Sequence, residues 1–148
     1  MWKSIVITTL IAGTLDIVAA CLHAYWTAKI MPERVLKYIA SGLFGKSAFA
    51  SGPPMIFLGL LIHFCITFAC AFVFYWIYPK WALLKFSFFI NALFIGIVAW
   101  LVTTQLLIPL SPITTPPFNL LKAVWAICIL IVCIGLPIAF RAQQFYKL

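Results

Sequence analysis

Residues 4–28 read SIVITTLIAGTLDIVAACLHAYWTA and contain one full charge, Asp16. A helix of about 20 apolar residues is long enough to cross about 30 Å of hydrocarbon. The stretch is bounded by Lys3 and Lys29, and it is continuously apolar where a strand of a membrane barrel would alternate. It therefore predicts a transmembrane helix.

The composition of the whole chain agrees with this prediction. Of its 148 residues, 66% are hydrophobic and 8% are charged, and the mean hydropathy is +1.19. A soluble domain is about 45–50% apolar and about 25% charged. Too few polar residues remain to cover a water-facing surface, which excludes soluble globular, disordered and collagen-like proteins. We expect a single transmembrane domain over residues 1–148.

Three further apolar stretches follow the first one. They predict spans at residues 55–78, 86–108 and 123–140. The link between the first two spans is too long for a simple turn. Its residues 32–44 place apolar side chains at helical spacing opposite Arg34 and Lys37, which predicts a short amphipathic helix lying in the membrane interface. The predicted fold class is all-α, an integral membrane four-helix bundle with this interfacial helix between helices 1 and 2.

Basic residues are in large excess. Ten Lys and Arg oppose two acids, which gives a net charge of +8. In a soluble protein this charge would suggest nucleic-acid binding, but here most of the bases flank apolar runs, where anionic lipid headgroups lie. We expect the lipid bilayer, and no nucleic acid, as the partner. The bases divide equally between the two sides of the membrane, and the uncharged link before the last span favours cytoplasmic termini.

Asp16 is the most informative polar residue because it lies at the midpoint of the first span. Insertion scales assign an aspartate at the bilayer centre a cost of about 2.5–3.5 kcal/mol. We therefore expect it to face a partner, a cavity or water. Small and polar residues, which let a neighbouring helix approach closely, share its helix face. They are Thr9, Gly13, Ala20, His23 and Thr27.

The depths of the polar residues, at about 1.5 Å per residue along each helix, predict a polar half-channel above Asp16. Its wall would consist of His63, His23 and Gln105. Its mouth would be flanked by Arg34, Lys37 and Lys46, bases that could equally contact lipid headgroups. Asn91 would lie in the opposite half of the membrane, and Asn91 and Gln105 could simply hydrogen-bond between helices.

Two functions fit this pattern. An aspartate and two histidines can relay protons, which suggests proton-linked transport or a channel component, in an oligomer because the chain is small. Alternatively, Asp16 accepts hydrogen bonds that fix the helix register in a structural or accessory subunit of a larger membrane complex. The sequence has no nucleophile–base set, so we do not expect an enzyme. It also has no Cys-x-x-Cys or His-x-x-x-His pair, so we expect no metal and no cofactor.

Several motifs together are familiar. They are Leu15-Asp16, residues 34–45 (RVLKYIASGLFG), residues 58–64 (LGLLIHF), residues 109–111 (PLS) and residues 135–139 (GLPIA). They resemble a family of small, uncharacterised bacterial inner-membrane proteins with four spans, loosely YagU-like. The resemblance covers most of the chain and implies four spans in a bacterial inner membrane, with no activity attached. Where the family has a histidine one turn before GLPIA, this chain has residues 130–133, LIVC.

Overall fold

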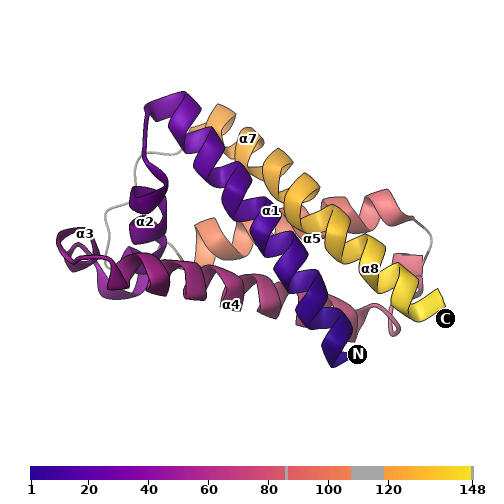
Figure 1. The fold of residues 1–148 in the computed structure, drawn as a ribbon. Coiled ribbons are helices and arrows are strands. Elements are labelled where there is room, and N and C mark those ends of the chain that lie inside the picture. Colours follow the sequence, from indigo (N-terminus) through magenta and orange to yellow (C-terminus); the bar gives the residue numbers. More distant parts are fainter. Residues whose placement is uncertain (86, 108–118, 148) are drawn as a thin grey trace.

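The computed structural model describes residues 1–85, 87–107 and 119–147, and the regular structure of these residues is all helical (Figure 1). The long elements are α1 (Trp2–Ala28), α4 (Pro54–Ile77) and a final continuous helix made of α7 (Leu120–Leu130), the π-helical turn η3 (Ile131–Gly135) and α8 (Leu136–Lys147). The shorter elements are α2 (Pro32–Phe44), α3 (Ser47–Ala50), the 3-10 turn η1 (Ala82–Lys85), α5 (Phe88–Leu101) and the π-helical turn η2 (Val102–Leu107). The predicted all-α class is confirmed.

Three helices are long and apolar enough to cross a membrane, namely α1, α4 and Leu120–Lys147. They correspond to the first, second and fourth predicted spans and indicate a membrane protein. The third predicted span contains a shorter apolar helix, Phe88–Thr104. It begins at Phe88 because Ser87 caps it, with the Ser87 hydroxyl accepting from Ile90 N at 3.4 Å. The predicted end at Ile108 and the proline-rich link after it lie outside the described residues.

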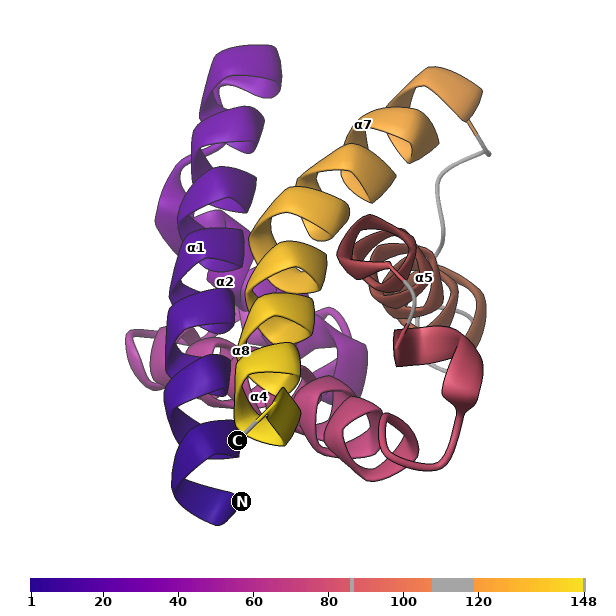
Figure 2. The same cartoon turned by 90° about the vertical axis from the view of Figure 1, so that its right-hand side faces the viewer.

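The helices form two pairs that cross each other. α1 and the final helix run side by side, and α4 and α5 run across them (Figures 1 and 2). In Figure 2, α1 and α8 stand upright while α5 is seen nearly along its axis. α4 packs on α1 and α2, whereas α5 packs on η3 and α8. The beginning of α1 and the end of α8 lie together at one end of the molecule in both views.

Glycines stand where two of these elements touch backbone to backbone. A Cβ atom on Gly59 of α4 would collide with the Leu36 carbonyl of α2. A Cβ atom on Gly135 of η3 would likewise collide with the Ala92 carbonyl of α5. Small residues of this kind allow helices to pack at short range without a hydrophobic driving force from lipid. Gly59 therefore determines how closely α2 packs on α4, and Gly135 determines how closely η3 packs on α5.

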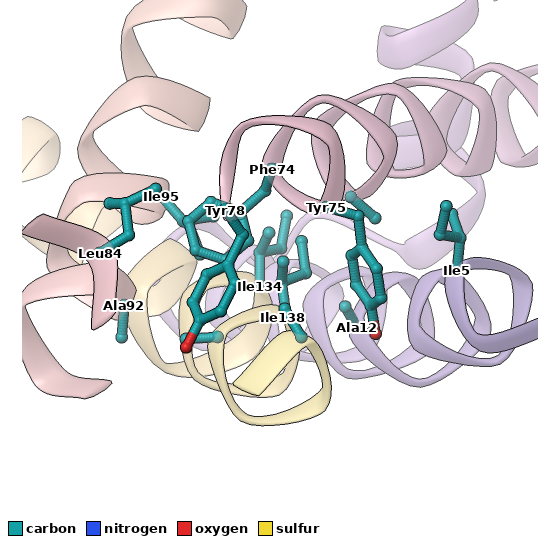
Figure 3. Close-up of a cluster of buried hydrophobic side chains, with 13 residues drawn as sticks. Ile5, Ala12, Phe74, Tyr75, Tyr78, Leu84, Ala92, Ile95, Ile134 and Ile138 are labelled. Atoms are coloured by element: carbon teal, nitrogen blue, oxygen red, sulfur yellow. The ribbon is translucent and has the colours of Figure 1, made fainter. Parts of the chain in front are cut away.

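The buried core lies where the two helix pairs cross (Figure 3). Tyr75 of α4 and Ile138 of α8 are both fully buried there. The Tyr75 hydroxyl lies 3.0 Å from the hydroxyl oxygens of Ser4 and Thr8 on α1. The Tyr146 hydroxyl of α8 donates to the Tyr75 carbonyl at 2.8 Å. One tyrosine thus links α4 to both α1 and α8.

Candidate functional site

Asp16 and His63 meet where α1 packs on α4. His63 Nε2 lies 3.9 Å from Asp16 Oδ2, and the two side chains are 11% and 12% exposed, respectively. Among the described residues this is the one contact between a carboxylate and a basic side chain within ion-pair distance. Asp16 therefore turns towards a neighbouring helix.

A backbone carbonyl of α1 fixes the His63 ring. His63 Nε2 lies 2.9 Å from the Gly13 carbonyl oxygen. A carbonyl oxygen can only accept, so Nε2 must carry a hydrogen in this arrangement. The second ring nitrogen, Nδ1, is then the position at which His63 can gain or lose a proton without breaking this bond. The hydrogen-bearing Nε2 is also the nitrogen that approaches Asp16.

Gly13 allows α4 to approach this carbonyl. A Cβ atom at position 13 would lie 2.6 Å from Cε1 of Phe64, the residue that follows His63. The Phe64 ring in turn packs edge-on against the His63 imidazole, with ring centroids 5.6 Å apart. The absence of a side chain at Gly13 therefore makes room for the aromatic group that covers the histidine.

The surroundings of the pair are small, polar or thiol-bearing. Thr67 donates its hydroxyl to the His63 carbonyl at 3.0 Å. The Thr9 hydroxyl, one turn before Gly13, is buried and finds no hydrogen-bond partner among the described residues. Cys70 on α4 and Cys133 on η3 are half-buried free thiols. Cys133 belongs to a π-helical turn, a distortion that is frequent at functional sites.

The other predicted wall residues do not join this pair. His23 lies two helical turns beyond Asp16 and packs beside Trp125 of α7, with ring centroids 6.4 Å apart. The side chain of Gln105 lies outside the described residues. Asn91 is buried on α5, where its amide nitrogen donates to the Leu84 carbonyl. The structure thus places two of the predicted residues together, Asp16 and His63.

The three bases predicted at the mouth lie on or just after α2. Arg34 and Lys46 are exposed and Lys37 is half-buried. In the part of the chain that the structure describes, none of them forms an ion pair with Asp16. α2 itself covers the first turns of α4 around Gly59, one turn before His63.

Sequence reasoning missed the Gly13 carbonyl as the partner of His63. Backbone carbonyls occur at every residue, so the sequence carries no signal for this one. The spacing of Gly13, Asp16 and His63 on two facing stripes nevertheless indicated that these positions share an interface.

The described residues do not form a metal site here. In the described ranges, no three His, Cys, Asp or Glu side chains come together in a way that could hold a metal ion. The cysteines are free thiols. The site as built consists of one carboxylate, one imidazole and the carbonyl that orients it.

Comparison with family models, curated proteins and solved structures finds no match to this chain.

Proposed function

We propose that the chain is a multi-pass protein of a bacterial inner membrane, of the loosely YagU-like family, in which Asp16 and His63 bind and release protons. It would act as a proton-linked transporter or as a channel component. The observation that carries the proposal is the buried Asp16 carboxylate, at mid-length of an apolar helix and 3.9 Å from a titratable ring. Ionisable groups at this depth are costly and mark ion or proton pathways.

The geometry supports a simple proton step. In the charged state, His63 carries hydrogens on both ring nitrogens and Asp16 is ionised. The ring turns its Nε2 hydrogen from the Gly13 carbonyl to Asp16 and transfers it, which leaves a neutral ring protonated on Nδ1 and a neutral carboxylic acid. Both charges vanish in the same step, so neither group is left as an isolated ion in an apolar region, which would be strongly unfavourable. Release of the Asp16 proton and uptake of a proton at the bare Nε2 would restore the starting state.

The topology belongs to the same proposal. We place α1, α4, the helix beginning at Phe88 and the final helix across the membrane as four spans, and α2 in the interface. Arg34, Lys37 and Lys46 would then contact anionic headgroups. Both termini would face the cytoplasm. Because 148 residues leave little room for a closed pore, the conducting form would be a homo-oligomer.

Proton flux into proteoliposomes tests the proposal. The purified chain is reconstituted with a pH-sensitive dye inside, and a potassium diffusion potential drives proton entry. We expect wild-type vesicles to acidify, and Asp16→Asn vesicles to match protein-free ones because the amide binds no proton. Glu33→Gln removes the other acid of the chain and is the matched control, expected to keep the wild-type rate.

His63→Gln sharpens the test. A glutamine amide can still donate to the Gly13 carbonyl, but it cannot take up a proton. We expect this variant to keep its helical content and to lose flux, whereas His23→Gln keeps both because His23 packs on α7. Wild-type flux in either Asp16→Asn or His63→Gln would overturn the proposal.

A second function is favoured by a different observation. The apolar face of α7 is strongly exposed, with Leu120 and Leu121 at 69% and 68% and Trp125 at 55%. This surface would fit an accessory subunit that docks on a larger membrane complex, and Asp16 would then fix the α1–α4 register. In that case wild-type vesicles show no flux. A partner that co-purifies from membranes is also lost when Trp125 is replaced by alanine.

A further inference from the structure

A cavity of about 270 Å³ lies at the end of the molecule where the chain termini meet. Its lining comes from the end of α4, the short link after it and the last turns of α8. The lining residues are Tyr78, Pro79, Lys85, Gln143, Tyr146 and Lys147. The Tyr78 and Tyr146 rings stack on each other with centroids 5.4 Å apart. The cavity is therefore built from two helix ends that an aromatic pair holds together.

The charged residues that line this cavity, in the part of the chain that the structure describes, are both basic. Lys85 and Lys147 come from different elements and converge on it. The only acidic residues of the sequence are Asp16 and Glu33, and neither of them lines the cavity. The other lysine of the link, Lys80, instead lies 3.2 Å above the centre of the Trp76 ring. Two exposed lysines thus line a space that neither Asp16 nor Glu33 lines.

The position of the cavity selects the ligand chemistry. α4 has 24 residues and spans about 36 Å at 1.5 Å per residue, which exceeds about 30 Å of hydrocarbon. With α4 across the membrane, as proposed above, its end reaches the level of the lipid headgroups. Lysine is a common phosphate ligand, and the Gln143 amide adds a donor. A volume of about 270 Å³ lies below the range of about 300–1,000 Å³ typical of sites for larger organic ligands.

We propose that this cavity binds the phosphate group of an anionic phospholipid. The phosphate would lie between the Lys85 and Lys147 ammonium groups and accept from the Gln143 amide. The stacked rings of Tyr78 and Tyr146 would form the apolar wall beside the glycerol. This lipid site is separate from the Asp16–His63 pair; it rests on the proposed placement of α4 across the membrane and not on proton transfer by that pair.

Native mass spectrometry of the full chain, released from detergent micelles, tests the site. Phosphatidylglycerol, phosphatidylcholine and inorganic phosphate are titrated separately. We expect wild type to retain phosphatidylglycerol in preference to phosphatidylcholine, and the double variant Lys85→Gln/Lys147→Gln to bind it about 25-fold more weakly, about fivefold for each lysine. Lys122→Gln, which removes an exposed lysine on α7, is the matched control and keeps the wild-type affinity.

A second double variant and a competition with inorganic phosphate complete the experiment. The double variant Lys85→Arg/Lys147→Arg keeps both charges and should retain the lipid, which separates loss of charge from loss of fold. Equal phosphatidylglycerol affinity in wild type and the glutamine double variant would overturn the site. Displacement of the lipid by inorganic phosphate at equal concentration would overturn the lipid assignment, because the phosphate alone would then account for binding.

Discussion

At Asp16, the free-energy penalty of a carboxylate in hydrocarbon is reduced by one imidazole, which a single carbonyl of α1 holds in place. The high insertion cost made it predictable from sequence that Asp16 would face inward. The place of His23 was not predictable in the same way, although it shares the helix stripe of Asp16. The polar contacts between α4 and α1 run from Ser4 to Asp16, and His23 lies beyond them. Two turns further along, the same stripe meets Trp125 of α7.

Tyr75 provides a prediction at the residue scale. Replacement by phenylalanine removes the hydroxyl that lies between Ser4 and Thr8, while the buried ring and its packing stay. Hydrogen bonds between membrane helices average about 0.6 kcal/mol each, so we expect the free energy of unfolding to fall by about 1 kcal/mol. Unfolding by SDS in mixed micelles measures it. Tyr38→Phe, at an exposed position of α2, is the control and should leave this free energy unchanged.

At the scale of the elements, the helix ends near charges and prolines followed from the sequence. α1 ends before Lys29, and α2 begins with Pro32, a residue favoured in the first helical turn. The π-helical turns η2 and η3 could not be predicted from the sequence. An extra residue in a helical turn is tolerated when tertiary contacts require it, and Gly135 in η3 is pressed against the Ala92 carbonyl of α5. No local residue pattern reports such a contact, because it depends on a helix about forty residues away in the chain.

Gly59 and Gly42 give a matched pair of predictions for α2. Gly59→Ala would drive a Cβ atom into the Leu36 carbonyl, so we expect α2 to separate from α4 at a cost of about 1–3 kcal/mol. A Cβ atom on Gly42 would meet no described atom within 4 Å. Gly42→Ala should therefore stabilise α2 by about 0.5–1 kcal/mol, through the lower helix propensity of glycine.

Amide hydrogen exchange over residues 32–44 separates these two outcomes. Exchange should become faster in Gly59→Ala and slower in Gly42→Ala. Unchanged exchange in Gly59→Ala would show that α2 does not depend on the close contact with α4.

At the scale of the whole molecule, hydropathy determined the number and length of the apolar stretches but not the angles between them. Helix tilt depends on packing against neighbours, and hydropathy does not encode it. Gly96 of α5 and Gly135 of η3 supply that packing here, because each lies against the backbone of the other element where the two helix pairs cross. The four-helix membrane bundle therefore remains a prediction, and three helices of sufficient length are what the structure shows.

Membrane sidedness follows from the arrangement of the ends. The start of α1, the end of α8 and the link after α4 lie at one end of the molecule, and α3 lies away from them (Figure 1). In a background without cysteine, we expect Lys85→Cys and Gln144→Cys to react with an impermeant maleimide from the same side of the membrane. Ser47→Cys on α3 should react from the opposite side. Labelling of all three positions from one side would contradict four crossings.

The π-helical turn η3 determines how α8 is rotated about the helix axis relative to α7. Each residue of an α-helix advances the chain by about 100° around its axis. If Ile131–Gly135 formed an ordinary α-helix with the same five residues, α8 would be rotated about its axis by about one such step. Tyr146 would then swing away from the Tyr75 carbonyl, and Lys147 away from Lys85. The additional residue that η3 accommodates thus orients the end of α8 towards the rest of the protein.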